Sequence, residues 1–464
     1  MSNFLFDEFE TVSAKQWKQK IQFDLKGADY NDTLVWQSAE GIHVKPFYHN
    51  DNFSTDFLPI PGQPSQWNIG QSIFIDNPVI ANKLALDAIE RGATAIYFTT
   101  HEAKDNNDSP QELSLDYQKV FQNFPFENVT IYFNFQFLKP EFISNLITFL
   151  SEKNATVFYN LDPLGNLARA GNWFYNQKTD NELLDKIIKA NASEAILSID
   201  ITLYQNAGAN RVQQLAYALA HANEYLSSHD LSQQTVTFEV SIDTNYFFEI
   251  AKIRALRKLY AALASEYGLN EHCHIIARPS KRNKTLYDYN LNMLRMTTEC
   301  MSAILGGADT ICNLPYDGLY HKSNVFGERI ARNQLLILKS ESYFDMVSNT
   351  ADGSYYIENL TEELAQKALE LFKDIEKNGG FLQQLKQGTL QKKIKENAQK
   401  EQQLFNEGKL VLVGTNKYQN EGDRMKDELE LYPFVKRNPR QTAIEPILEN
   451  RLAEALEQER LSHE

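Results

Sequence analysis

Eight short runs of β-branched and aromatic residues alternate with amphipathic stretches between residues 67 and 342. Several of these runs lack the polar alternation of a half-exposed strand, which indicates strands covered on both faces, as in parallel α/β sheets. The predicted strands are Trp67–Phe74, Thr94–Thr99, Val129–Phe135, Thr156–Asn160, Ala195–Thr202, Thr235–Ile242, His274–Ala277 and Thr310–Leu314.

Helix signals lie between these runs. Pro78–Arg91 follows Asn77, a residue type that caps helix N-termini, and a glycine comes directly after the stretch. Phe247–Tyr267 places apolar residues at helical spacing and also ends before a glycine. We expect Asp288 to cap a further helix that runs to Gly306.

The number and order of these elements predict the fold. About eight βα units in about 275 residues match the size of a TIM-type (β/α)8 barrel. The rival architecture is a doubly wound open sheet, which would need a Gly-rich first turn to bind a dinucleotide, and no GxGxxG follows any predicted strand. We therefore predict an α/β protein with a (β/α)8 barrel over residues 67–342.

Two extensions flank the predicted barrel. Residues 1–66 contain a predicted helix near Ala14–Leu25, followed by an irregular segment. Residues 343–464 contain predicted helices at Thr361–Asn378 and Ile444–Leu461, separated by a charged stretch. Because neither extension is large or apolar enough to fold alone, we expect an N-terminal arm that wraps a partner and a C-terminal helical extension.

Composition narrows the classes of partner. The 464 residues carry a net charge of −15, with acids and bases interleaved, whereas nucleic acids and anionic membranes require basic patches. No run approaches the ~18 apolar residues of a membrane span, and the acidic N-terminus lacks signal-peptide features. The three cysteines, Cys273, Cys300 and Cys312, include no CxxC pair. We expect a reduced, cytoplasmic protein that binds neither nucleic acid nor membrane.

Segments spread over nearly the whole chain carry a family resemblance. They are Trp17–Lys20, Asp24–Gly27, Gly41–Pro46, Phe248–Ala255, Asn290–Arg295, Gly306–Asp309, Arg329–Asn333, Gly353–Glu358 and Leu360–Ala365. In this order they resemble the methylmalonyl-CoA mutase family. That resemblance implies isomerisation of a branched acyl-CoA thioester to a straight one by an adenosyl radical from cobalamin. It also implies that a catalytic chain threads its substrate along the barrel axis and carries a flavodoxin-like domain for the corrin.

The cobalamin-binding motif of the family is missing from this sequence. In the family, the lower cobalt ligand is the His of Asp-x-His-x-x-Gly, and none of the nine histidines here lies in that pattern. A ligating histidine must be oriented by its carboxylate partner. We therefore expect no flavodoxin-like domain and no cofactor or metal bound by this chain alone, with adenosylcobalamin held by a homologous large subunit.

The catalytic pair of the family is also replaced. The catalytic subunit has Tyr-His-Met-Gln-Glu-Ala-Gly-Ala after its fifth strand, and the run here is Thr202-Leu203-Tyr204-Gln205 followed by Asn-Ala-Gly-Ala. In the family, the His donates a hydrogen bond to the thioester carbonyl and the Tyr shields and steers the radical. Leu203 has no donor, and losing a preorganised donor at a carbonyl costs about 10²–10³ in rate. Tyr204 would face the opposite side if the strand continues. No catalytic residue is therefore expected.

A vestigial pocket is expected at the barrel mouth, formed by Thr202, Leu203, Gln205, Arg278 and Lys281. The last two follow the seventh strand, at the face where barrels usually bind ligands. They could be remnants of a contact with the CoA phosphates, or they could form ordinary ion pairs within a loop.

Two acids at strand ends are also candidates for chemistry. Asp200 and Asp243 could act as carboxylate bases, but binding a helix N-terminus or an arginine is the simpler interpretation. By contrast, Tyr159–Gly165 and Arg282–Asp288 look like small-subunit signatures of the family, and Gly62–Ile69 lacks the arginine and tyrosine of the catalytic chain.

Three functional classes remain open. The leading hypothesis is the small subunit of a heterodimeric, adenosylcobalamin-dependent methylmalonyl-CoA mutase, non-catalytic itself and stabilising the large subunit that binds acyl-CoA. The alternative is an active acyl-CoA mutase barrel that uses a separate cobalamin-binding subunit. An unrelated barrel hydrolase or lyase is the third class, and no nucleophile, metal or paired-carboxylate motif supports it.

Overall fold

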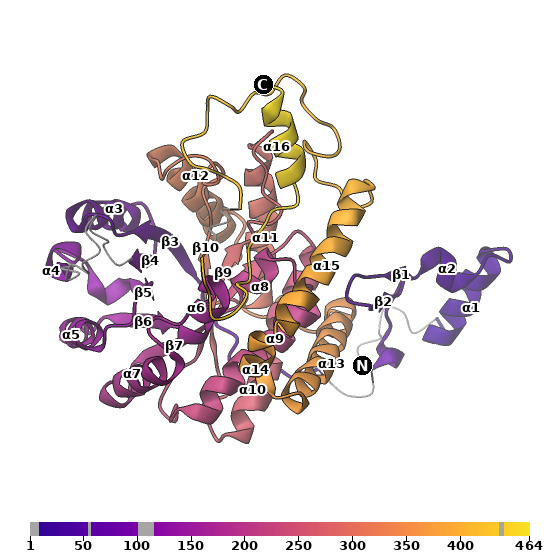
Figure 1. Cartoon of the computed structure of the whole chain (residues 1–464). Helices are drawn as coiled ribbons and strands as arrows, with labels where there is room; N and C mark the ends of the chain where they lie inside the picture. The colour runs from indigo at the N-terminus through magenta and orange to yellow at the C-terminus, as the bar shows by residue number, and fades with distance from the viewer. Residues whose placement is uncertain (1–8, 54–56, 101–115, 436–439) are drawn as a thin grey trace.

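The eight predicted strands all form, and they close into a parallel barrel (Figure 1). The computed structural model describes residues 9–53, 57–100, 116–435 and 440–464. Closure occurs where the last strand pairs with the first, with Thr310 opposite Asn68. The prediction of a (β/α)8 barrel is confirmed. Its strands are β3 (Asn68–Phe74), β4 (Ala95–Thr100), β5 (Thr130–Phe135), β6 (Thr156–Leu161), β7 (Ala195–Asp200), β8 (Thr237–Ile242), β9 (His274–Pro279) and β10 (Thr310–Cys312).

The helices of the barrel follow the predicted order and form its outer layer (Figure 1). Among the described residues, no helix is long and apolar enough to cross a membrane. The helices are α3 (Pro78–Glu90), α4 (Tyr117–Val120), α5 (Pro140–Ser151), α6 (Pro163–Ala170), α7 (Gln177–Ala190), α8 (Thr202–Asn206), α9 (Arg211–Ser228), α10 (Tyr246–Glu266), α11 (Leu291–Gly306) and α12 (Val325–Leu336).

Helix ends agree with the sequence signals in one case and differ in another. The Asn77 side chain accepts hydrogen bonds from the backbone of Val79 and Ile80, as expected for the N-cap of α3. The cap predicted at Asp288 is wrong, because α11 begins three residues later and Asn290 occupies the cap position. Asp288 has a φ of 47° and therefore lies in the turn that precedes the helix.

Strand β7 ends two residues before its predicted end at Thr202. The Asp200 carboxylate accepts a hydrogen bond from the Thr202 backbone N–H at 3.0 Å, and this local bond turns the chain into α8. Tyr204 therefore does not lie on a continuing strand. It is buried within α8, and its hydroxyl lies 3.0 Å from His221 Nδ1.

Aromatic side chains fill the layer between strands and helices. Phe98, Phe133 and Tyr159 lie on neighbouring strands, and the ring centroid of Phe133 lies 5.8 Å from that of Phe98 and 6.1 Å from that of Tyr159. All three side chains are fully buried. Stacked aromatic rings of this kind contribute both buried area and specific ring geometry to the core.

The residues that alternate with these rings fill the barrel interior. Tyr97, Tyr132 and Phe158 lie directly opposite one another on β4, β5 and β6 and point inward, since side chains alternate along a strand. Across the barrel, the Tyr132 hydroxyl lies 2.8 Å from His274 Nε2 and 2.6 Å from Thr310 Oγ1. The rings of Phe158 and His274 stack with centroids 4.0 Å apart.

A second set of contacts crosses the barrel from Tyr97 in the same layer. The Tyr97 hydroxyl donates to the Glu239 carboxylate on β8 at 2.8 Å, and the Arg278 guanidinium on β9 lies 3.8 Å from the Tyr97 ring centroid. Arg278 Nη1 donates to Ser72 Oγ on β3 at 3.2 Å. Side chains from opposite walls therefore meet at the barrel axis. Burial raises the pKa of Glu239 to about 7, although the Arg278 charge acts in the opposite direction.

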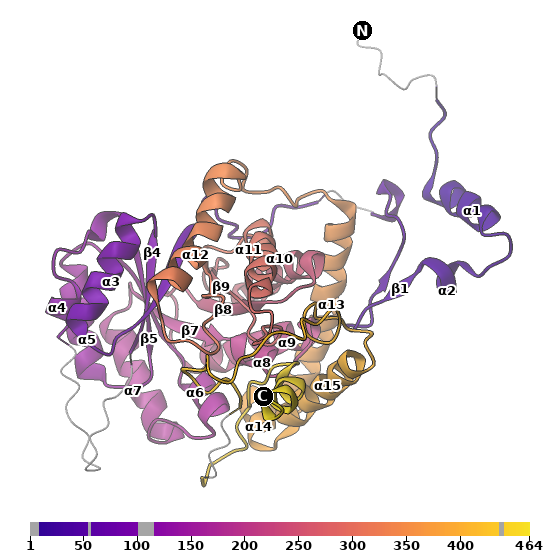
Figure 2. The same ribbon diagram turned by 90° about the horizontal axis from the view of Figure 1, so that it is seen from above.

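An N-terminal arm projects from the barrel beyond α13 (Tyr355–Lys377), as Figures 1 and 2 show. Glu40 anchors the arm to α9 through an ion pair with Arg211 at 2.9 Å, and the Trp36 ring packs edge-on against Phe248 of α10. The elements of the arm are α1 (Ala14–Asp24), α2 (Tyr30–Leu34), the short ribbon of β1 (Trp36–Gln37) and β2 (His43–Val44), and the 3₁₀ turn η1 (Asn50–Asn52).

The C-terminal part of the chain packs against the barrel. Helix α13 lies against α9 and α10, and α14 (Gly380–Lys386) and α15 (Thr389–Asn406) follow it (Figure 1). Within the described residues, each strand belongs either to the barrel or to the two-stranded ribbon of the arm. The sheet of a flavodoxin-like domain is therefore not among them.

The predicted helix Ile444–Leu461 is wrong over its first half. Only α16 (Glu454–Ser462) is helical, and the preceding segment is extended. Pro446 lies in the first turn of the predicted helix, where proline is tolerated, so this residue alone does not prevent the helix. The extended segment instead forms backbone hydrogen bonds with α6 and α8, from Ile447 to Ala168 at 2.8 Å and from Asn450 to Asn206 at 3.1 Å.

Replacing Phe133 tests the outer core. Phe133→Ala is expected to lower the free energy of unfolding by about 3–5 kcal/mol, because it opens a cavity among stacked rings. Chemical denaturation followed by tryptophan fluorescence measures the change. Phe23→Ala removes a ring that is 78% exposed and is the matched control, expected to stay near the parent. Equal losses for the two variants would contradict this account of the core.

Replacing Glu239 tests the electrostatics of the interior. The pKa of Glu239 is higher in the folded chain than in the unfolded chain, so its carboxyl group keeps its proton more tightly when the chain is folded. The contribution of Glu239 to the free energy of unfolding therefore falls as pH rises from about 4.5 through about 7. Glu239→Gln keeps an acceptor for Tyr97 but cannot ionise. Denaturation curves measure the free energy of unfolding of both proteins. Relative to the parent, that of the variant should rise by about 2 kcal/mol between pH 5 and pH 8. The exposed Glu370→Gln is the control, and a pH-independent difference would refute the prediction.

Candidate functional site

A cavity of about 580 Å³ lies at the C-terminal mouth of the barrel. This is the face where the barrel loops carry ligand sites in other (β/α)8 proteins. Every strand, or the loop directly after it, contributes to the wall, with Ser72, Tyr97, Asn134, Asn160, Ser198, Glu239, Arg278 and Leu314 as one residue from each.

The structure brings together three of the five residues expected in the vestigial pocket. Thr202, Arg278 and Lys281 line this cavity. Leu203 does not, since the turn into α8 places it in the apolar core with 1% of its surface exposed. Gln205 lines a different cavity of about 670 Å³, which lies between the arm, α9 and α15.

Arg169 and Glu449 are wall residues that the sequence did not single out. Arg169 on α6 forms ion pairs with Asp200 and, at 3.2 Å, with Glu449 of the extended C-terminal segment. Burial acts to raise the pKa of Glu449, but the charges of Arg169 and Lys281 hold it below its ordinary value. Glu449 could not be found from the sequence, because the helix predicted there placed it on a regular helical face.

The acids at the strand ends hold arginines and backbone groups, in agreement with the simpler interpretation. Asp200 pairs with Arg169 and binds the N-terminus of α8, and Asp243 lies 3.4 Å from Arg211. Loss of solvent around Asp243 acts to raise its pKa, but the charge of Arg211 brings the pKa to a net value below the ordinary range.

Both ring nitrogens of His221, which contacts α8, already have partners within the protein. His221 is completely buried, with Nε2 2.9 Å from Asp162 and Nδ1 3.0 Å from the Tyr204 hydroxyl. Asp162 in turn accepts from the Gly165 backbone at the start of α6. His221 therefore neither lines the cavity nor has a ring nitrogen free for a cobalt ion. Among the described residues, no group of three or more His, Cys, Asp or Glu side chains is placed to hold a metal.

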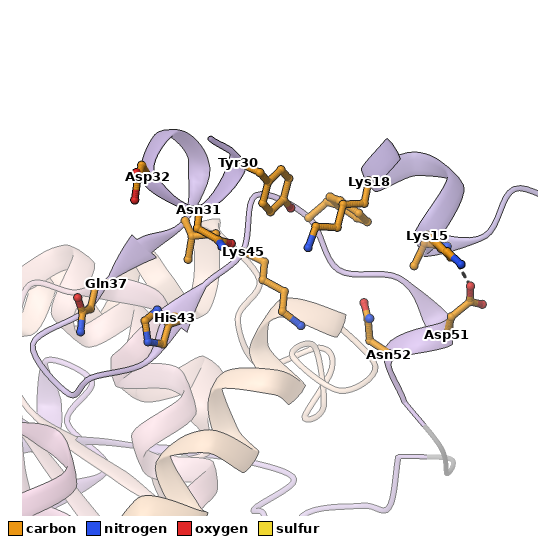
Figure 3. Close-up of a pocket in the computed structure, with 13 residues that line it drawn as sticks. Lys15, Lys18, Tyr30, Asn31, Asp32, Gln37, His43, Lys45, Asp51 and Asn52 are labelled. Atoms are coloured by element: carbon orange, nitrogen blue, oxygen red, sulfur yellow. Dashed lines mark hydrogen bonds between the residues drawn. The ribbon is translucent and has the colours of Figure 1, made fainter. Parts of the chain in front are cut away.

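A larger groove of about 870 Å³ lies in the arm rather than in the barrel (Figure 3). Figure 3 shows Lys18 and Lys45 pointing into it, and Lys18 Nζ lies 4.7 Å from the ring centroid of Tyr30. Its walls come from α1, α2, the ribbon and η1. This groove is therefore a surface of the arm and is separate from the barrel mouth.

Comparison with known proteins places most of the chain in one family. The family model described as methylmalonyl-CoA mutase matches residues 63–462. The solved dihydropteroate synthase of Thermus thermophilus is similar over 59% of this chain and 94% of its own, with 12% identity and a TM-score of 0.32.

Named relatives agree with the family model. The methylmalonyl-CoA mutase small subunit of Porphyromonas gingivalis is 32% identical over 92% of this chain and 73% of its own length. The small subunit of Streptomyces virginiae is 27% identical over 83% of this chain and 67% of its own. The methylmalonyl-CoA mutase of Cereibacter sphaeroides is 28% identical over 88% of this chain, which spans only 64% of that relative. The chain therefore belongs to the methylmalonyl-CoA mutase family.

Proposed function

We propose that this chain is the small, non-catalytic subunit of a heterodimeric, adenosylcobalamin-dependent methylmalonyl-CoA mutase. In this proposal a homologous large subunit binds the cofactor and interconverts methylmalonyl-CoA and succinyl-CoA, and this chain stabilises it. Two relatives named as small subunits of that enzyme support the assignment. The absence of the Tyr-His pair, replaced by Thr202 and Leu203, supports the non-catalytic role.

The filled barrel axis is the observation that carries this proposal. A substrate that threads a barrel requires an open channel, but here Tyr132 reaches across to His274 and Thr310 at 2.8 and 2.6 Å. Beside it, Tyr97 donates a hydrogen bond to Glu239 across the axis at 2.8 Å. Protein interiors are packed densely enough that such layers leave no room for a chain of atoms.

The burial of Leu203 argues against a hidden catalytic site. An active barrel that borrows a separate cobalamin-binding subunit would still need a donor to the thioester carbonyl. Leu203 has no donor and lies in the core, and His221 is engaged by Asp162 and Tyr204. We therefore prefer the supporting role over the active alternative.

The arm supplies the surface for a partner. Trp17 and Phe23 on α1 are 49% and 78% exposed, and Trp36 on β1 is 51% exposed. No residue of α1 is buried, so this helix gains little from packing on its own chain. Exposed apolar groups that cluster on one segment mark an interaction surface. In the proposed heterodimer, the arm of residues 9–53 wraps the large subunit.

Reconstitution tests the proposed role. The chain alone should show no mutase turnover with adenosylcobalamin, and mixing it with the large subunit should give a stable one-to-one complex by size-exclusion chromatography with light scattering. A separate free cobalamin-binding protein, added to this chain without the large subunit, should give no turnover either. Turnover in that mixture would favour the active alternative, and failure to form the complex would end the proposal.

The arm can be tested apart from the fold. A Trp17→Ala, Phe23→Ala double variant should weaken association with the large subunit at least tenfold, about 1.4 kcal/mol, because it removes the two most prominent rings of α1. Its melting temperature alone should match the parent. Tyr418→Ala, which removes a ring 74% exposed outside the arm, is the control and should bind normally. Unchanged affinity for the double variant would show that α1 does not contact the partner.

A further inference from the structure

We propose that the cavity at the barrel mouth binds a small free carboxylic acid, held by the guanidinium edge of Arg278 and the side-chain amide of Asn160. This proposal goes beyond the supporting role, because it gives the chain a ligand of its own that is not an acyl-CoA. It concerns residues of this chain only, so it can be tested without the large subunit.

Arg278 lines the cavity, and one edge of its guanidinium is only partly engaged by the protein. Its Nη1 donates to Ser72, and the guanidinium is fixed in place by stacking on Tyr97 at 3.8 Å. Nε and Nη2 are buried and have no hydrogen-bond partner. These two N–H groups form the edge of a guanidinium that binds a carboxylate through two parallel hydrogen bonds. Glu239 forms a long ion pair with Nη2 at 3.5 Å, and its carboxylate also accepts the Tyr97 hydroxyl at 2.8 Å. A ligand carboxylate at this edge would therefore replace Glu239 as the partner of Nη2.

Asn160 offers a second unused group in the same wall. Only 4% of its surface is exposed, it lines the cavity, and neither its amide nitrogen nor its amide oxygen has a partner. Its φ of 40° lies in the left-handed region, which asparagine tolerates better than most residues. The register between β6 and β7 shifts between Phe158 and Leu161, so Asn160 lies within a strand irregularity. Such irregularities redirect side chains beside functional sites.

The charge of the free groups selects the ligand. Four carboxylates line the cavity, and each already has a partner in the protein. Asp162 pairs with His221, Asp200 and Glu449 pair with Arg169, and Glu239 accepts from Tyr97 and forms the long ion pair with Arg278. The capacity that remains lies on Arg278 and Asn160, with Lys281 in the same wall. Unpaired buried donors beside a cation favour an anion with oxygen acceptors.

The shape of the cavity limits the ligand to a small molecule. Its volume of about 580 Å³ falls in the range of small-molecule sites, and Glu449 of the extended C-terminal segment forms part of its wall. The crossing contacts of Tyr97 and Tyr132 close the axis beneath it, so the long arm of a CoA thioester has no path through the barrel. A free mono- or dicarboxylic acid fits where its thioester does not.

Calorimetry on the full-length chain tests the proposal, with acetate, propionate and succinate as probes and with inorganic phosphate and CoA as competitors. At least one acid should bind saturably with a Kd below about 10 mM. Arg278→Gln and Asn160→Gly should each weaken that binding at least tenfold. Arg329→Gln, which replaces an exposed arginine that stacks on Phe326, should leave it unchanged.

The outcomes separate this proposal from its rivals. No saturable binding by any of the three acids would overturn it, as would phosphate or CoA binding more tightly than the acids. Unchanged affinity in Asn160→Gly would overturn the assignment of the amide, and glycine accepts the positive φ there, so this variant stays informative if Arg278→Gln does not fold. Circular dichroism and melting temperature report on folding. Failure of large-subunit pairing would leave these results untouched.

Discussion

A (β/α)8 barrel has one interior, and the contacts that cross it decide what the rest of the molecule can do. Here the chain's own side chains fill the interior, because Tyr132 contacts His274 and Thr310 across the barrel, and Tyr97 contacts Glu239. The two tyrosines, Glu239 and Thr310 of these polar bridges are buried, where an unpaired group would be costly, so the bridges hold the walls at fixed spacing. The family fold is thus retained while the passage that a threaded substrate would use is occupied.

Filling the axis leaves two regions free for other roles. Above the crossing contacts, the barrel mouth keeps a polar cavity whose acids are paired, and whose unpartnered groups include the Nε of Arg278 and the side-chain amide of Asn160. Away from the barrel, the arm exposes rings such as Phe23 and buries no residue of α1. Both features are consistent with the proposed supporting role.

Much of the fold could be predicted from the sequence, because strands buried on both faces and capped helices leave local signals. The site could be predicted only in part. Asp200 binds the Thr202 backbone, and β7 ends earlier than predicted. If the strand had continued, Leu203 would face the barrel mouth, but the turn places it in the core. Glu449 was missed because long-range backbone hydrogen bonds, rather than helical periodicity, set the path of the C-terminal segment. The role of Asn160 could not be predicted, because only the structure shows that its side-chain amide has no hydrogen-bond partner.

The stoichiometry of substrate binding tests the central claim most directly. Equilibrium binding of a non-reactive acyl-CoA analogue to the reconstituted heterodimer counts the barrels that accept a thioester. If the crossing contacts of Tyr97 and Tyr132 close the axis of this chain, one analogue should bind per heterodimer, and removing this chain should leave that number unchanged for the large subunit. Two analogues per heterodimer would show that this barrel opens to acyl-CoA and would contradict the account.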